Sequence, residues 1–208
     1  MKEYSKTEEF LNTITHGIGI FLSLIATVLL MVKAFNSGQT DYIISFAVFG
    51  LSLLILYSAS TLYHGATNIE RKKKLKVFDH SAIYVLIAGT YTPFALIGLK
   101  DAWGWSIFGV EWGLALAGII LKLFYTGKFE KISTIAYVLM GWIVVIAIKP
   151  MMDNLQEGAL CWLFIGGAFY TVGALLYMIK KIPYNHAIFH VFVLAGSFSH
   201  FMAVYYYL

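Results

Sequence analysis

The chain has 208 residues, of which 60% are hydrophobic and 12% carry a charge, and its mean hydropathy is +0.76. A soluble domain of this length could not bury so much apolar surface, so the composition excludes a soluble protein and predicts an integral, multi-pass protein of the cell membrane. The net charge of +4 does not indicate a nucleic-acid partner, because lysines and arginines in the loops of a membrane protein set its orientation.

The cysteine content limits the kinds of site that the chain can form. Cys161 is the only cysteine, so an intramolecular disulfide and a thiolate-rich metal site are both excluded. Any metal ion must be held by histidine, aspartate or glutamate side chains.

Seven apolar runs approach the length of about 20 residues that a helix needs to cross the hydrocarbon core. They lie near residues 13–34, 42–63, 79–99, 104–125, 132–149, 158–179 and 186–207. The connections between them are short, and we expect a single domain, residues 1–208, that folds as an all-α bundle of seven transmembrane helices. Pro93 lies within the third run and should bend that helix.

The basic residues indicate how the bundle is oriented. With a cytoplasmic amino terminus, 12 of the 15 lysines and arginines fall on the inner side, and only Lys33, Lys100 and Lys149 fall on the outer side. This asymmetry predicts a cytoplasmic amino end and an extracellular carboxyl end. It excludes the arrangement of G-protein-coupled receptors, which have the opposite orientation.

Four candidate metal ligands converge at one depth, just inside the inner leaflet. His64 ends the second run, Asp79 begins the third, and His186 and His190 lie in the first two turns of the seventh. Residues four apart share one face of a helix, so His186 and His190 can reach the same ion. Three imidazoles and a carboxylate suit Zn²⁺. Ser60, one turn before His64, could donate a hydrogen bond into this site.

Simpler interpretations exist for individual members of this group. His64 alone could cap the end of the second helix, and Asp79 could be an ordinary N-terminal capping residue. Their shared depth favours the metal site.

The other ionisable residues in the runs are expected to have supporting roles. We expect His200, about 15 Å from His190 along the helix, to be a hydrogen-bonded core residue, and His16 to be structural or to support a ligand. His80 should face a neighbouring helix or the interface, and Glu111 should form a hydrogen bond between helices.

Several motifs resemble the progestin and adipoQ receptor family, and within it the bacterial hemolysin III-like branch. They are Ser60-Thr61-Leu62-Tyr63-His64, Phe78-Asp79-His80-Ser81, Gly89-Thr90-Tyr91-Thr92-Pro93-Phe94, His186-Ala187-Ile188-Phe189-His190 and Ser199-His200-Phe201, with Glu8, Asn12, Thr15 and His16 near the start. The resemblance implies a seven-helix bundle with zinc bound by His64, His186 and His190, Asp79 holding a zinc-bound water, and Ser60 nearby.

The same resemblance suggests what the protein does. The adiponectin receptors are associated with ceramide hydrolysis, and the wider superfamily includes alkaline ceramidases, so a zinc-dependent hydrolase of a lipid amide or ester bond is the leading hypothesis. Membrane lipids, an acyl-chain substrate or a free fatty acid are the expected partners. The alternative is a non-enzymatic membrane-homeostasis or lipid-sensing protein with structural zinc. A pore-forming cytolysin ranks third, because a seven-span protein is held in its own membrane.

Overall fold

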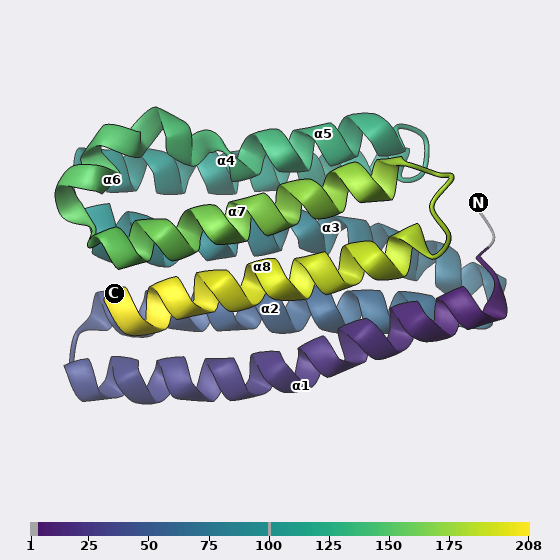
Figure 1. Cartoon of the computed structure of the whole chain (residues 1–208), viewed down its shortest axis with the longest axis horizontal. Helices are drawn as coiled ribbons and strands as arrows, with labels where there is room; N and C mark the ends of the chain where they lie inside the picture. Colours follow the sequence, from purple (N-terminus) through teal and green to yellow (C-terminus); the bar gives the residue numbers. More distant parts are fainter. Residues whose placement is uncertain (1–3, 100) are drawn as a thin grey trace.

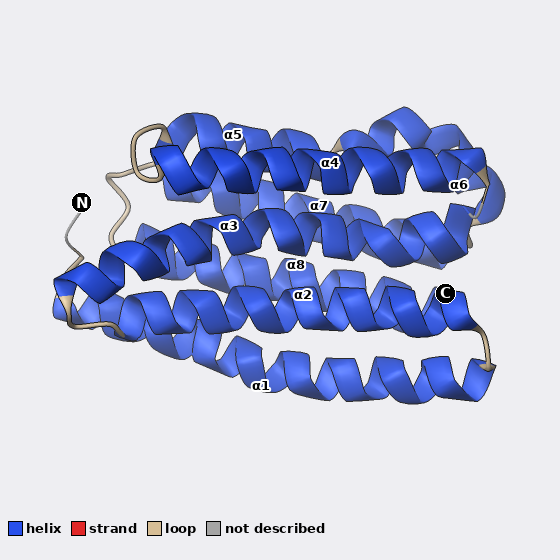
Figure 2. Cartoon of the chain, turned by 180° about the vertical axis from the view of Figure 1, so that it is seen from behind, coloured by secondary structure: helices blue, strands red, loops and turns tan. Residues whose placement is uncertain are grey.

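The structure is a computed structural model that describes residues 4–99 and 101–208, and these residues contain helices and no strand. Lys2 and Lys100, which entered the charge asymmetry, lie outside the described residues. Figures 1 and 2 show the helices lying side by side with short connections. The elements are α1 (Lys6–Ser37), α2 (Thr40–Gly65), α3 (Ile69–Pro93), the π-helix η1 (Phe94–Leu99), α4 (Ala102–Tyr125), α5 (Glu130–Gly141), the 3₁₀-helix η2 (Ile143–Ala147), α6 (Ile148–Asn154), α7 (Glu157–Met178) and α8 (Asn185–Tyr207).

Within the described residues, seven helical stretches are long and apolar enough to cross a membrane. The third combines α3 with η1, and the fifth combines α5, η2 and α6. The predicted class, an all-α integral membrane protein built as a seven-helix bundle, is therefore confirmed. The two termini lie at opposite ends of the bundle, as an odd number of crossings requires (Figure 1).

Local capping sets several helix ends. The Ser5 hydroxyl accepts a hydrogen bond from the Glu8 amide at the start of α1, and Gly38 ends that helix in the left-handed conformation. Asn68 caps α3 through the Arg71 amide. Helix α3 begins at Ile69, ten residues before the predicted start at residue 79. The charged segment 70–76 consists of good helix formers and extends the helix beyond its apolar part.

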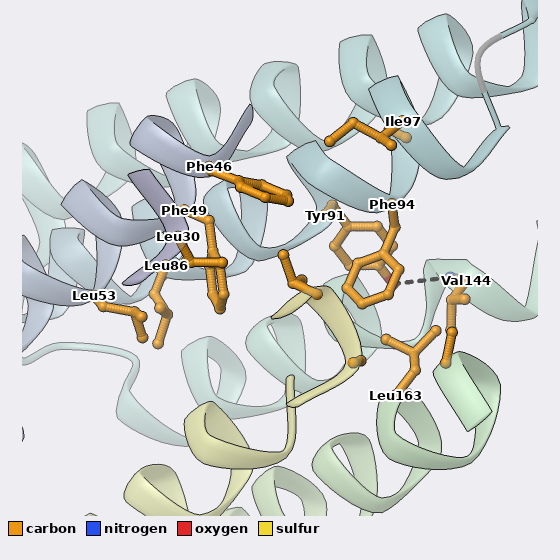
Figure 3. Packing of buried hydrophobic residues seen from close by; sticks show 14 of the residues in the cluster. Leu30, Phe46, Phe49, Leu53, Leu86, Tyr91, Phe94, Ile97, Val144 and Leu163 are labelled. Carbon is orange, nitrogen blue, oxygen red and sulfur yellow. Dashed lines mark hydrogen bonds between the residues drawn. The ribbon is translucent and has the colours of Figure 1, made fainter. Parts of the chain in front are cut away.

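The third and fifth spans are irregular at neighbouring positions. After Pro93 the third span continues as the π-helix η1, and the bend predicted at this proline stays a prediction. The fifth span was expected to be continuous over 132–149, but α5 ends at Gly141 and gives way to η2. The Tyr91 hydroxyl bridges this break, donating to the Gly141 carbonyl at 2.8 Å and accepting from the Val144 amide at 2.9 Å. Figure 3 shows Tyr91 reaching Val144 across the core.

Large apolar side chains fill the centre of the bundle. Phe46 and Phe49 of α2 pack with Leu86 of α3, and further along the axis Phe94 and Leu163 belong to the same cluster (Figure 3). Helix α1 lies along α2 and α8 at the edge of the bundle, as Figure 1 shows. Many large apolar side chains on the outer surface are exposed, which suits contact with lipid rather than water. The protein is therefore a multi-pass membrane protein.

Candidate metal centre

Two helix ends bring three imidazoles together at one end of the bundle. His64 lies in the last turn of α2, and His186 and His190 lie in the first two turns of α8. The start of α8 is tied to the end of α7, because the Asn185 side-chain amide donates to the backbone carbonyls of Tyr177 and Ile179. These two hydrogen bonds help to fix the position of the start of α8, and with it the position of its histidines relative to α2.

The three imidazoles are close enough to share one ion. One ligating nitrogen from each of His64, His186 and His190 lies within 4.8 Å of the other two, and all three residues are buried. The Nε2 atoms of His64 and His186 are 3.1 Å apart. Two nitrogens bound tetrahedrally at the usual zinc–nitrogen distance would be separated by about 3.3 Å, so this spacing is compatible with a metal centre.

Residues near the amino end of the chain contact the Nδ1 atoms of two of these rings. His64 Nδ1 lies 2.6 Å from Glu9 Oε2, and Glu9 also pairs with Lys72 at 2.6 Å. His186 Nδ1 lies 3.2 Å from the Tyr4 hydroxyl. Burial raises the pKa of the Tyr4 phenol well above its usual value, and the nearby Tyr177 adds to this, so the hydroxyl stays neutral.

The third ring is held in the same way. His190 Nδ1 lies 3.2 Å from Thr15 Oγ1 and 3.3 Å from the Asn12 carbonyl oxygen. The Thr15 hydroxyl itself donates to the Leu11 carbonyl, which leaves its lone pairs free to accept from His190. Protons on all three Nδ1 atoms would satisfy these contacts and would leave each Nε2 lone pair available to an ion. Histidine ligands of metal ions are commonly oriented by such partners. The donor set therefore fits a resident metal ion.

Asp79 and Ser60 lie beside the three imidazoles but do not join their cluster. Both are buried, and both line a cavity that also touches His186 and His190. Asp79 is not one of the three residues whose ligating atoms lie within 4.8 Å of one another. The Ser60 side chain interacts with Asp79, but its hydroxyl makes no hydrogen bond of ordinary geometry within the described part of the chain. These two side chains thus face the space next to the nitrogens.

The cavity extends from this polar end deep into the bundle. Its walls come mainly from α3, η1, α5, α6, α7 and α8, and they are mostly apolar, including Leu86, Phe94, Met151 and Val193. The mostly apolar interior, with His186 and His190 at its polar end, suits an extended hydrophobic group.

The remaining ionisable residues differ from one another in their surroundings. His200 is a buried core residue whose Nε2 lies 3.1 Å from the Leu163 carbonyl oxygen. His16 stacks on His190 with ring centroids 3.5 Å apart, and neither of its nitrogens has a hydrogen-bond partner among the described residues. His80 lines the cavity. The expected hydrogen bond of Glu111 between helices is wrong: the side chain is buried in α4, and both oxygens lack a hydrogen-bond partner within the described part of the chain.

Sequence reasoning did not identify Tyr4 and Glu9 as partners of the histidines. A signal for part of this set was present, since Glu9, Asn12 and His16 fall at i, i+3 and i+7 on one face of an otherwise apolar helix. A polar stripe of this kind in a membrane span generally faces the protein interior.

Comparison with known proteins assigns the chain to a family. The sequence matches the family model described as "Haemolysin-III related" over residues 4–201. The protein belongs to the haemolysin-III-related family. The chain is 48% identical to the hemolysin-3 homolog of Bacillus subtilis (strain 168), over 96% of this chain and 94% of that protein. It is 45% identical to hemolysin-3 of Bacillus cereus, over 96% and 91% of the two chains.

A more distant relative supports the wider resemblance. The chain is 22% identical to an adiponectin receptor protein of Drosophila melanogaster, over 93% of this chain and 49% of the receptor. The similarity between this haemolysin-III-related protein and the adiponectin receptors is therefore confirmed.

Proposed function

We propose that this protein is a zinc-dependent hydrolase that cleaves an amide or ester bond of a membrane lipid in the cytoplasmic leaflet. One observation carries the proposal: three buried imidazoles converge at the polar end of a long apolar cavity, and the carboxylate of Asp79 lies on the cavity wall outside their cluster. Three protein ligands with a position left open are typical of catalytic rather than structural zinc sites.

His64, His186 and His190 would hold the ion through their Nε2 atoms. Zinc bound there would supply a water molecule with a pKa of about 7 and would polarise the scissile carbonyl. Asp79 would orient the attacking water and accept its proton, which is the role of a general base. Ser60 would donate its hydroxyl to the substrate or to Asp79. The apolar walls would hold the acyl chain and keep bulk water away from the reacting carbonyl.

A second candidate is a sensor or membrane-homeostasis protein in which zinc has a structural role. The contacts of the Nδ1 atoms favour it, since an ion held by α2 and α8 would also fix α1 through Glu9 and Thr15. A third candidate, a pore-forming cytolysin, agrees with the names of the two Bacillus relatives. We rank it lowest, because a bundle with an apolar outer surface is held firmly in its own membrane.

Asp79→Asn separates the first two candidates. The amide keeps the size of the side chain and removes its basicity, while the three imidazoles remain. We expect elemental analysis to find near-normal zinc and lipid hydrolysis to fall by about 10²-fold or more. His190→Ala serves as the comparison and should lose most of the metal. Loss of zinc and of thermal stability in Asp79→Asn would instead indicate a closed, structural site, and unchanged hydrolysis would remove Asp79 from the reaction.

A further inference from the structure

A second, polar pocket lies at the same end of the bundle, between the start of α3 and the turn that joins α4 to α5. Its lining residues are Lys73, Lys76, Val77, Thr126, Gly127, Lys128 and Glu130. Glu130 also lines the apolar cavity, so the two spaces share a wall. The polar pocket therefore adjoins the chamber that contains the histidines.

Two lysines near this shared wall are buried. Lysines that only set the orientation of a membrane protein do not need to be. Lys76 is 8% exposed, and its Nζ lies 2.9 Å from Glu130 Oε1. Lys122, which lines the apolar cavity, is 4% exposed and donates to the Ser133 hydroxyl. Charges that merely orient a membrane protein can remain in water, whereas burying an ammonium group has an energetic cost. These two lysines therefore indicate a site for an anion.

Positive charge is in excess around the pocket. The positive groups are Lys73, Lys76, Lys122 and Lys128. The carboxylates that face them are Glu130, Glu70, which pairs with Lys73 at 2.7 Å, and Asp79, one turn beyond Lys76 on α3. Four ammonium groups thus face three carboxylates. A ligand with a negative charge would neutralise the excess positive charge.

We propose that this pocket binds the phosphate of a glycerophospholipid whose acyl chain occupies the apolar cavity. The inference rests on the proposed hydrolase function and names its substrate class. Lys76 and Asp79 are three residues apart on one helix, about 4.5 Å along its axis. A few bonds separate the phosphate of such a lipid from its nearest ester carbonyl, so a phosphate on the lysines brings that carbonyl to Asp79 and the histidines.

The test compares two double variants that remove equal charge from the same segments. Lys73→Gln with Lys128→Gln changes the pocket, and Lys74→Gln with Lys131→Gln changes exposed lysines outside it. Both are made in the full-length Asp79→Asn protein, so that binding is measured without turnover. The probe is fluorescently tailed phosphatidylglycerol, titrated by anisotropy. We expect the pocket variant to bind on the order of tenfold more weakly and the control to stay within about twofold of its parent.

Three outcomes would overturn the proposal. Equal weakening by both double variants would mean that diffuse surface charge attracts the lipid. Equal affinity for neutral diacylglycerol would remove the role of the phosphate. Competition by millimolar inorganic phosphate that also binds alone would identify free phosphate as the ligand. Hydrolysis by the wild-type protein is measured separately, so a protein that discriminates phosphatidylglycerol but cleaves no lipid would contradict the hydrolase function and not the headgroup site.

Discussion

At the scale of single residues, Glu9 is the one charged group among the described partners of the three histidine rings. One of its oxygens lies at hydrogen-bond distance from His64 Nδ1, and the other accepts a hydrogen bond from Lys72. The partners of His186 and His190 are the neutral Tyr4 and Thr15. A carboxylate behind an imidazole fixes its tautomer and increases its basicity toward a metal ion. Glu9 should therefore contribute more to metal affinity than the neutral partners do.

Replacing Glu9 with glutamine tests this contribution. The amide keeps the size of the side chain but removes its negative charge, so we expect zinc affinity to fall by about 10- to 100-fold. Competition with a chromophoric chelator provides the measurement. Glu8→Gln is the matched control, because Glu8 lies next to Glu9, its side chain is not among the described partners of the histidines, and the change in net charge is the same. Equal affinities of the two variants would show that Glu9 does not support the site.

The sequence was sufficient to propose the three histidines but not all of their partners. The spacing of His186 and His190 and their common depth with His64 follow from helix geometry alone. The pairing of Glu9 with His64 depends on how α1 leans across the end of the bundle, which is a tertiary contact between segments 55 residues apart. Periodicity indicates which face of α1 is polar, but it does not identify the helix that this face meets.

At the scale of helices, α4 comes close to the π-helix η1 at Gly104. A methyl group at Gly104 would overlap the backbone carbonyl oxygen of Ala95, and backbone cannot move aside as a flexible side chain can. The same helix contains Gly109, where an added methyl group would meet nothing within 4 Å. The irregular turn after Pro93 and the missing side chain at Gly104 therefore belong to one packing arrangement.

Alanine at these two glycines should have opposite effects. Gly104→Ala forces α4 away from η1, and overpacking of this kind costs about 1–3 kcal/mol of stability. Gly109→Ala only improves helix propensity, so its stability should be unchanged or rise by up to about 1 kcal/mol. Thermal unfolding of the purified proteins in one detergent measures both. A Gly104→Ala protein as stable as Gly109→Ala would contradict the close approach.

Hydropathy located the helices better than it described their interiors. An average over about 20 residues finds each span but does not detect where the hydrogen-bond pattern changes within it. The break at Gly141 depends on Tyr91 satisfying backbone groups from another helix, and the long start of α3 depends on a cap at Asn68. Such details come from single side chains at particular positions, to which a window average is insensitive.

At the scale of the whole molecule, the candidate centre lies at the end of the bundle where the chain begins. The loop between α2 and α3 is at the same end, and the carboxyl terminus is at the other (Figure 1). The charge asymmetry predicts that the end with the centre faces the cytoplasm. This placement remains a prediction and determines which leaflet supplies the lipid.

Reporter fusions test the orientation directly. A reporter attached after Leu208 should be accessible from outside intact cells, and one inserted within the basic segment 71–76 should not. An accessible basic segment with a protected carboxyl terminus would place the centre at the outer leaflet and would overturn the predicted orientation. Selective labelling of single introduced cysteines at the same two positions gives an independent reading.

The contact between the first and last helices affects how the protein is made. Tyr4, just before α1, and Thr15 of α1 hold the rings of His186 and His190, which lie at the start of α8. A chain still emerging from the ribosome has inserted α1 and presented His64 long before the other two histidines exist. The three-imidazole cluster can therefore assemble only after synthesis is nearly complete, when the two ends of the chain meet in the bilayer. The complete metal site would then exist only in a full-length chain, and a truncated product would contain His64 without the two α8 imidazoles.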